Sequence, residues 1–287
     1  QSVNPQATQQ TTGNTTNRAQ GSSSCISQKL VSGGLEGANM VTLVVYDFDW
    51  SLINENSDTF VIHQLDPSGV LWKQALVRLK GGEQWTQLMD WCASQLHTAG
   101  HSIVDLEQAL RRAPALKGVL AAVELAREHG AELRILSDAN EAYIRWILDA
   151  LGLGDSVFTM IETNGAAATP EGRLRITPHQ PVGTPHNCPN CPPNLCKGAV
   201  LESWLRGRTR STSPPRCAYV GDGGGDFCPA TRLGVDDTLF ARRAPHDGLL
   251  RKCLEAPAAV RARVVEWSDE EEGVSLLEGF REFFAHR

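Results

Sequence analysis

Two acidic residues, Asp47 and Asp49, stand directly after an apolar run of the sequence, Val41 to Tyr46. An apolar run of this length, bounded by polar residues, is typical of a buried strand. In open parallel α/β sheets, ligands bind in the crevice beyond the carboxyl ends of the strands. Two carboxylates at the end of such a strand therefore form a candidate active site.

Two further predicted strands also end on groups that can bind a metal ion or a phosphate. Residues 131–136 are followed by Ser137, and residues 217–220 are followed by Asp222 and Asp226. Clustered carboxylates repel one another unless a cation compensates their charge, and a site with few, hard oxygen ligands suits Mg²⁺. We therefore expect a magnesium site where these strand ends converge, with a phosphate group completing the coordination shell.

A positive charge for the phosphate is expected from Lys197, which follows a Pro-rich loop at the start of a predicted helix. The hydroxyl group of Ser137 can bind another phosphate oxygen. Because phosphoryl transfer depends mainly on positioning and charge neutralisation, this small set of groups is chemically sufficient.

The elements that would position these residues alternate along the chain. After the first strand, helical patterns cover residues 58–65, 83–96, 104–112 and 116–129 with no strand between them. The alternation continues through residues 131–136, 141–151, 158–162, 173–176, 197–205, 217–220, 238–241, 246–255, 260–267 and 271–286. Such repetition predicts an α/β fold with a Rossmann-like parallel sheet covered on both faces, and a small helical cap inserted after the first strand.

The first 40 residues differ in composition from the rest, because they are rich in Gln, Ser, Thr, Asn and Gly and contain no aromatic residue. We expect a disordered, low-complexity tail over residues 1–40. A single domain is expected over 41–287, with its core at 41–57 and 130–287 and its helical cap at about 58–129.

The overall composition favours a protein that acts on small molecules. The 287 residues include 33 acidic and 27 basic ones, a net charge of −6, whereas nucleic-acid-binding proteins usually present a basic face. No apolar stretch approaches the length of a membrane span. The eight cysteines are too sparse for a disulfide scaffold, so reduced thiols and a cytoplasmic location are expected. The sequence leaves the oligomeric state open.

Together, these residues resemble the motifs of a known superfamily. Asp47 and Asp49, Ser137, Lys197 and the run Gly-Asp-Gly-Gly-Gly-Asp at 221–226 are similar, in order and spacing, to the four motifs of haloacid dehalogenase (HAD)-type phosphatases. Within that superfamily, residues 56–58, 136–140, 188–197 and 221–229 resemble the phosphoethanolamine/phosphocholine phosphatase group. The resemblance extends from Val41 to the C-terminus and implies the fold of a HAD core.

The resemblance implies that Asp47 is the nucleophile and forms an aspartyl-phosphate. Asp49 would protonate the leaving group and then activate the water that hydrolyses the intermediate. The implied activity is magnesium-dependent hydrolysis of a phosphomonoester, namely phosphocholine or phosphoethanolamine. Pyridoxal phosphate, thiamine phosphate and phosphoserine are alternative substrates, and a non-catalytic sensor of phosphorylated ligands is an alternative of another class.

The resemblance also implies the residues that hold the ion and the phosphate. Magnesium would be bound by Asp47, the backbone carbonyl of Asp49 and Asp222, and Asp226 would steady this shell. Ser137 and Lys197 would hold phosphate oxygens.

Two positions depart from the superfamily pattern. Ser51 replaces the usual Thr and retains its hydroxyl group, so we expect little effect. Gly225 stands where Asn is frequent, which removes a side-chain amide near the metal and leaves its effect on metal affinity open.

A positively charged head group of the substrate can be held by carboxylates or by the face of an aromatic ring. Asp58 and Asp138 are the candidate substrate-binding residues, and Trp50 can be either a pocket wall or a core residue. Trp85 and Trp91 are expected in the core rather than at a bound cation.

A further cluster of possible metal ligands precedes Lys197. His186, Cys188, Cys191 and Cys196 include one Cys-x-x-Cys pair followed by another Cys. A zinc site, a disulfide and a loop of reduced thiols are all compatible with this spacing.

Overall fold

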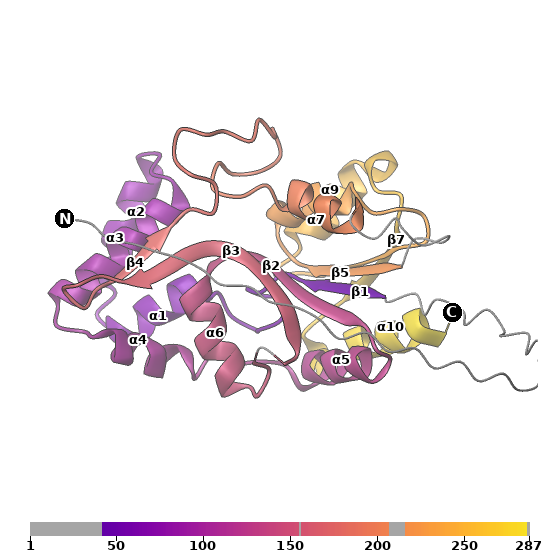
Figure 1. Ribbon diagram of the computed structural model, residues 1–287, viewed down its shortest axis with the longest axis horizontal. Helices are drawn as coiled ribbons and strands as arrows, with labels where there is room; N and C mark the ends of the chain where they lie inside the picture. The colour runs from indigo at the N-terminus through magenta and orange to yellow at the C-terminus, as the bar shows by residue number, and fades with distance from the viewer. Residues whose placement is uncertain (1–41, 155, 207–215, 286–287) are drawn as a thin grey trace, which may run out of the picture. The chain divides into compact units, whose positions relative to one another are not determined.

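The structure is a computed structural model that describes residues 42–154, 156–206 and 216–285 (Figure 1). The predicted tail, residues 1–40, lies outside the described residues. All of these described residues belong to one compact unit. In the described part of the chain, no helix has both the length and the apolar character needed to span a membrane.

A seven-stranded sheet in the order β4-β3-β2-β1-β5-β6-β7 forms the centre of the unit. Its strands are β1 Leu43–Tyr46, β2 Glu132–Asn140, β3 Phe158–Ala168, β4 Leu174–Thr177, β5 Cys217–Gly221, β6 Thr238–Arg242 and β7 Arg263–Trp267. All neighbouring strands run parallel except β3 and β4, which pair in an antiparallel manner. The predicted α/β fold is confirmed, with the correction that its sheet is mixed at one edge.

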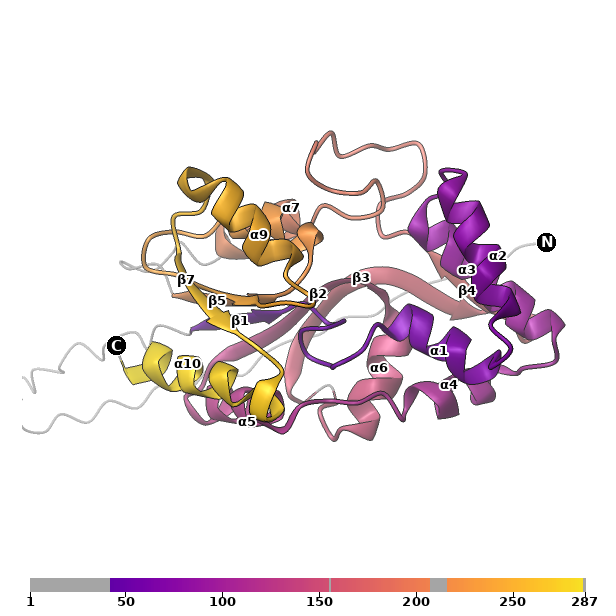
Figure 2. The same ribbon diagram turned by 180° about the vertical axis from the view of Figure 1, so that it is seen from behind.

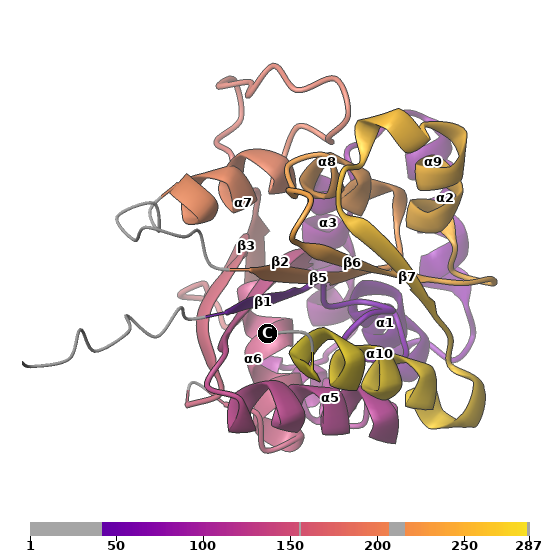
Figure 3. The same ribbon diagram turned by 90° about the vertical axis from the view of Figure 1, so that its right-hand side faces the viewer.

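Helices cover both faces of the sheet, as Figure 3 shows most clearly. One face carries α5 (Lys117–Glu128), α6 (Glu141–Ala150) and α10 (Val274–Ala285), and the other carries α7 (Lys197–Arg206), α8 (Phe227–Ala230) and α9 (Gly248–Glu255). The central strands are covered on both sides, since every residue of β1, β5 and β6 is buried. This burial explains why these strands appear as continuous apolar runs in the sequence.

A second group of helices lies beyond the carboxyl ends of the strands (Figure 2). It consists of α1 (Ser57–Leu65), α2 (Val70–Lys80), α3 (Trp85–Thr98) and α4 (Ile103–Leu110). Strand β4 packs against α3, so the hairpin of β3 and β4 joins this group although it comes much later in the sequence. Helix α2 was not expected from the sequence, because it buries only Leu71 and Ala75 and has little apolar periodicity.

Helix α5 falls within the predicted cap range but packs beneath the sheet, against α10 and β2. Its approach to the segment before α10 is close: a Cβ atom on Gly118 would lie 2.4 Å from the carbonyl carbon of Gly273. The position therefore requires a residue without a side chain. The division of the domain into core and cap stays a prediction.

The register of the central strands brings three strand ends together. Tyr46, the last residue of β1, pairs with Ile135 of β2 on one side and with Val220 of β5 on the other. The N–H group of Asp47 donates to the Val220 carbonyl over 2.9 Å, which extends this pairing beyond the strand. The polar residues that follow these strands consequently face one crevice.

We expect Gly118→Ala to lower the free energy of unfolding by about 1–3 kcal/mol, because the added methyl group would overlap backbone atoms that can separate only if α5 shifts. Urea denaturation measures this change. Glu128→Ala on the exposed side of the same helix is the matched control and should change the value by less than about 0.5 kcal/mol. Equal free energies of unfolding for the wild type and Gly118→Ala would show that α5 does not pack tightly against Gly273.

Candidate active site

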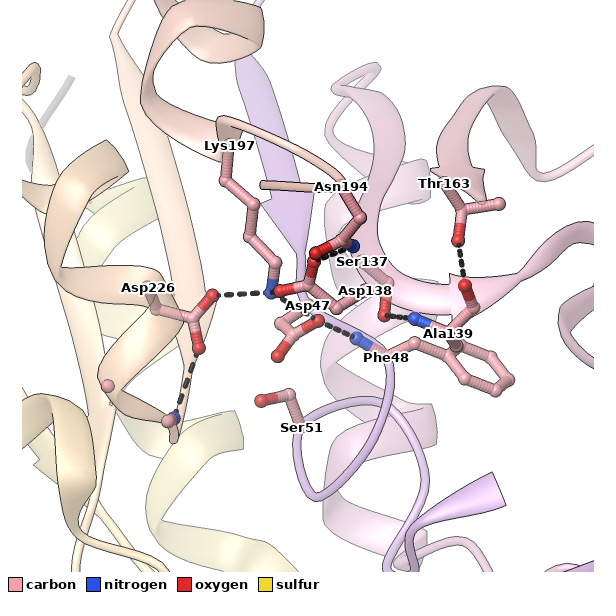
Figure 4. A network of polar contacts seen from close by, with 12 residues as sticks. Asp47, Phe48, Ser51, Ser137, Asp138, Ala139, Thr163, Asn194, Lys197 and Asp226 are labelled. Atoms are coloured by element: carbon pink, nitrogen blue, oxygen red, sulfur yellow. Dashed lines mark hydrogen bonds and ion pairs between the residues drawn. The ribbon is translucent and has the colours of Figure 1, made fainter. Parts of the chain in front are cut away.

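A buried lysine lies among the carboxylates of the crevice. The Nζ atom of Lys197, at the start of α7, lies 2.9 Å from Oδ1 of Asp47, 2.9 Å from Oδ1 of Asp226 and 3.9 Å from Oδ2 of Asp138 (Figure 4). Burial alone would lower the pKa of Lys197, but the carboxylates of Asp226, Asp47 and Asp138 raise it well above its usual value. The lysine is therefore a fixed positive charge at the strand ends.

The surrounding backbone fixes the carboxylates that face the lysine. Oδ1 of Asp47 accepts a hydrogen bond from the N–H group of Phe48 over 2.7 Å. Asp226 accepts at Oδ1 from the Tyr219 hydroxyl over 2.7 Å, and at Oδ2 from the N–H groups of Asp222 and Gly223 over 3.2 and 3.1 Å. Each carboxylate is thus oriented before any ligand binds.

Three carboxylates gather closely enough to share one metal ion. The side chains of Asp47, Asp222 and Asp226 each offer an oxygen, and these oxygens lie within 4.8 Å of one another. Burial, and then the charge of Asp226, raises the pKa of Asp47 to about 7. Burial, and then the charge of Asp47, raises the pKa of Asp222 to about 9. Burial and mutual repulsion both disfavour the charged form of these carboxyl groups. A bound divalent cation would offset both effects, so the donor set fits a hard metal ion.

Ser51 and Ser137 lie where the sequence analysis expects them. The Ser51 hydroxyl donates to Oδ1 of Asp222 over 3.2 Å and so helps to orient that carboxylate. Ser137 is 1% exposed, and its Oγ accepts from the N–H group of Ala139 over 3.2 Å. Because Oγ acts as the acceptor in this contact, the hydroxyl proton stays available for donation to an anion in the pocket that Ser137 lines.

Asp49 lies apart from the three metal-facing carboxylates. Its Oδ1 accepts from the N–H group of Ser57, the first residue of α1, over 2.9 Å. Burial raises the pKa of Asp49 well above its usual value, and the nearby charge of Asp58 raises it further. This environment favours the protonated form of the Asp49 carboxyl group.

These residues line a pocket of about 180 Å³, which is open on one side. Its lining residues are Asp47, Asp49, Trp50, Asn56, Asp58, Trp85, Ser137, Asp138, Ala139, Lys197, Asp222, Gly223, Gly225 and Asp226. The wall includes every residue that the sequence predicts for catalysis, phosphate, magnesium or substrate binding except Ser51, which contacts the wall residue Asp222. A side chain at position 225 would crowd Asp138, because a Cβ atom on Gly225 would lie only 3.3 Å from Oδ2 of Asp138. The glycine therefore leaves that carboxylate uncrowded.

The pocket wall away from the metal-facing carboxylates is acidic and aromatic. The indole N–H of Trp85 donates to Oδ2 of Asp58 over 2.7 Å, and both residues line the pocket. Both tryptophans pack against the hydrophobic core, as the sequence predicts, but Trp85 also lines the pocket. Trp91 instead packs beneath the guanidinium group of Arg78, which lies 4.4 Å from the ring centroid. Burial raises the pKa of Asp58 to about 6, although the bond from Trp85 opposes this shift.

Trp50 lines the pocket in a constrained backbone conformation. Its backbone is in the left-handed region, with φ of 58°, and its ring stacks on that of His246 at 3.7 Å between centroids. The carbonyl of Trp50 accepts a hydrogen bond from Arg242. Of the two alternatives that the sequence left open, the structure supports the pocket wall.

Two asparagines that the sequence analysis missed hold Asp138 in place. The side-chain amide of Asn194 donates to Oδ1 of Asp138 over 2.9 Å, and that of Asn164 donates to the Asp138 carbonyl over 2.6 Å. Both asparagines are buried. An Asn in a Pro-rich loop, such as Asn194, is typical of an exposed turn, so the sequence carries no signal for this role.

A sequence model of the family described as "Putative Phosphatase" matches residues 42–280. The chain belongs to this family of HAD-type phosphatases. It is similar to the thiamine phosphate phosphatase-like protein of Arabidopsis thaliana, with 34% identity over 82% of this chain and 93% of the relative. Inorganic pyrophosphatase 2 of the same plant is 34% identical over 82% of each chain. Bovine (Bos taurus) pyridoxal phosphate phosphatase PHOSPHO2 is 32% identical over 83% of this chain and 98% of its own.

Solved structures support the fold. A HAD family hydrolase from Salmonella enterica serovar Typhi has a TM-score of 0.54 at 16% identity, covering 83% of this chain and 71% of its own. A phosphoserine phosphohydrolase-like protein from Francisella tularensis has a TM-score of 0.51 at 14% identity, covering 83% of this chain and 99% of its own. At this level of identity, the likeness concerns the fold alone.

The raised pKa values predict how the metal-free protein responds to pH. An acid whose pKa is raised by folding stabilises the folded state fully below its unfolded pKa, near 3.8, and this contribution is lost as the pH rises through the folded pKa. The folded values for Asp47 and Asp222 are about 7 and about 9. In EDTA, we therefore expect Tm to fall from about pH 5 to about pH 9, and Mg²⁺ to reduce this fall.

Thermal unfolding at a series of pH values, with EDTA or Mg²⁺, measures this effect. Asp222→Asn removes one titrating carboxyl and should flatten the profile in EDTA. Asp236→Asn, the same substitution at an exposed position, should not change it. Identical profiles with EDTA and Mg²⁺ would contradict a metal site at these carboxylates.

Proposed function

We propose that this phosphatase is a magnesium-dependent phosphomonoester hydrolase that acts through an aspartyl-phosphate on Asp47. The observation that carries the proposal is the position of Lys197. Its Nζ lies 2.9 Å from Asp47, which follows β1, and 2.9 Å from Asp226, which follows β5. A non-catalytic sensor of phosphorylated ligands has no need for a carboxylate held against a lysine and beside a second, proton-bearing carboxyl group. The enzymatic alternative is therefore preferred.

We assign Oδ2 of Asp47 as the attacking atom. Within the described residues, the contacts of this carboxylate, from the Phe48 N–H and from Lys197 Nζ, are both made with Oδ1. Attack of Oδ2 on phosphorus forms the aspartyl-phosphate while the bond from phosphorus to the alcohol oxygen breaks. Lys197 and Ser137 are proposed to hold the remaining phosphate oxygens during this step.

Asp49 is proposed to supply and remove the proton. Its raised pKa favours the protonated form, which donates to the departing alkoxide. The resulting carboxylate then takes a proton from a water molecule, which attacks phosphorus, releases inorganic phosphate and restores Asp47. The bond from Ser57 to Asp49 keeps this carboxyl group beside the pocket during both steps.

Magnesium is proposed to be held by Asp47, Asp222 and the backbone carbonyl of Asp49, with Asp226 orienting the backbone around Asp222. When bound, the ion supplies positive charge that neutralises the phosphate. This assignment rests on the fit between the carboxylate cluster and a hard cation.

The substrate is proposed to carry a positive charge on its leaving group. Asp58 and Asp138 are the carboxylates of the pocket that neither the proposed metal site nor the proposed proton transfer uses, and Trp85 lies beside Asp58. A cation between these carboxylates and the indole face would be stabilised by charge and by the ring. Inorganic pyrophosphate would instead add negative charge to an acidic wall.

Thiamine phosphate is the substrate that we place first. Its thiazolium ring has a permanent positive charge and an aromatic face, which match the acidic and aromatic wall. Thiamine phosphate also appears in the name of a relative. Pyridoxal phosphate, named for other relatives, has a ring that is positively charged only when protonated. The names of the similar proteins described above support these alternatives better than phosphocholine or phosphoethanolamine, the substrates implied by the sequence motifs.

We expect Asp47→Asn to lower kcat by more than about 1,000-fold, because an amide oxygen is a poor nucleophile and forms no acyl-phosphate. EDTA should abolish activity of the wild type, and added Mg²⁺ should restore it. Phosphate release from p-nitrophenyl phosphate measures both effects. Asp236→Asn, an exposed site with the same change, should retain full activity. Comparable turnover by Asp47→Asn and the wild type would exclude Asp47 as nucleophile.

The charge of Asp58 provides a test of substrate choice. We expect Asp58→Asn to lower kcat/KM for thiamine phosphate by about tenfold, because a charge-assisted contact with the cationic ring is lost. Hydrolysis of p-nitrophenyl phosphate, whose leaving group has no positive charge, is the internal control. Since Asp58 also raises the pKa of Asp49, any general effect on proton transfer would reduce both rates.

A panel of thiamine phosphate, pyridoxal phosphate, phosphocholine, phosphoethanolamine, phosphoserine and pyrophosphate completes this test. A clear preference for pyrophosphate, or equal losses on both substrates in Asp58→Asn, would reject a cation site at Asp58. Inactivity on the whole panel and on p-nitrophenyl phosphate would favour the sensor.

A further inference from the structure

Four cysteines converge outside the pocket. Cys188, Cys191 and Cys196 come from the segment between β4 and α7, and Cys228 comes from α8. Their sulfur atoms all lie within 4.8 Å of one another. His186, the fourth ligand considered in the sequence analysis, is engaged elsewhere: its Nδ1 accepts from the N–H group of Cys188, and its Nε2 lies 2.9 Å from the Pro192 carbonyl.

We propose that these four cysteines bind a structural zinc ion that is distinct from the magnesium site. A tetrahedral site with Zn–S bonds of about 2.3 Å has sulfur–sulfur edges of about 3.8 Å. The Sγ atoms of Cys188 and Cys228 lie 3.6 Å apart, and the other pairs fall within the 4.8 Å limit, so small rotations of the side chains complete the site. Four thiolates close the coordination shell, which is typical of structural rather than catalytic zinc.

The arrangement differs from that of a disulfide. A disulfide joins two sulfurs at about 2.05 Å, whereas here four sulfurs lie within 4.8 Å of one another, and Cys188, Cys191, Cys196 and Cys228 form no disulfide. A convergence of four thiols from two separate segments matches the ligand number of zinc.

The backbone around Cys228 leaves room for this cluster. A Cβ atom on Gly198 would lie 2.4 Å from the Sγ of Cys228 and 3.1 Å from its carbonyl atoms. Any side chain at this position of α7 would displace the sulfur. Helices α7 and α8 therefore approach closely at Gly198 and Cys228. This tight packing fixes the position of the Cys228 sulfur, as a metal ligand requires.

The segment that carries Cys188, Cys191 and Cys196 has no regular secondary structure that would hold it in place. Residues 178–196 contain no helix or strand, and the segment projects from the body at the top of Figure 1. Most of its side chains are exposed, while Asn194, Leu195 and Cys196 at its end are buried. Long segments without secondary structure are uncommon in compact domains, and metal binding can supply the free energy that orders one.

The proposed ion would join the two segments that carry residues of the active site. Cys196 directly precedes Lys197, and Cys228 follows Asp226 by two positions. Zinc would thus hold fixed the two backbones whose side chains meet at 2.9 Å between Lys197 Nζ and Asp226 Oδ1. The cysteines act as positioning residues and do not touch the substrate.

Metal analysis of the purified full-length protein tests the proposal. We expect about one zinc ion per chain, retained after treatment with EDTA at a concentration that removes magnesium. The double substitution Cys188→Ala/Cys191→Ala should abolish this zinc content and lower Tm. Cys253→Ala, which removes a buried thiol of α9 outside the cluster, is the matched control and should retain zinc. Asp222→Asn should also retain zinc, which separates this site from the carboxylates.

Spectroscopy covers the case in which the double variant does not fold. Wild-type protein prepared without zinc, under reducing conditions, should bind Co²⁺ and develop the intense thiolate absorption of a tetrahedral sulfur site, and added Zn²⁺ should remove this absorption. Protein that binds neither metal would overturn the proposal. A bond between Cys188 and Cys228 found by mass spectrometry of the native protein, or zinc that is lost in Asp222→Asn but kept in the cysteine variant, would also overturn it.

Discussion

The active site depends on a charge imbalance that the fold keeps out of water. Three carboxylates, those of Asp47, Asp222 and Asp226, share one buried ammonium group, that of Lys197. Burying an unpaired charge is costly, so the backbone compensates with N–H donors at Asp47 and Asp226, and Tyr219 adds a hydroxyl donor. The remaining negative charge favours ligands that bring a cation with them. A phosphate ester accompanied by a divalent metal ion meets this requirement.

The sheet and the surrounding segments divide the work of recognition. Adjacent parallel strands set the positions of the carboxylates, since β1 lies between β2 and β5 in fixed register. The opposite wall comes from α1 and α3, through Asp58 and Trp85. The segment before α7 contributes Asn194, which reaches Asp138. In the proposed mechanism, the chemistry would depend on rigid strand ends, whereas the leaving group would contact elements that can vary without disturbing the sheet.

Local sequence patterns predicted those parts of the site that strand ends determine. Asp47, Ser137 and Asp222 follow apolar runs, and the rule that parallel strand ends face one crevice was enough to group them. Asp226 was grouped with Asp222 at the same strand end, and Lys197 was expected from its position at the start of a predicted helix. The sequence could not reveal that Trp85 reaches Asp58, because α1 and α3 are brought together only by tertiary packing. The same reason explains Cys228: the sequence favours a nearby fourth ligand such as His186, whereas the fold supplies one from α8.

The two groups of possible metal ligands are suited to opposite tasks. The carboxylates are hard oxygen donors that leave coordination positions for a phosphate, so an ion there can exchange and take part in turnover. The thiolates are soft donors that fill all four positions of a tetrahedral ion, so an ion there would be held tightly and remain inert. This difference would keep each metal in its own site, even though Cys228 is only two residues from Asp226. A chain that positions a buried lysine through a long irregular segment would gain from two such sites, because a magnesium ion could be released without loosening the backbone that holds Lys197.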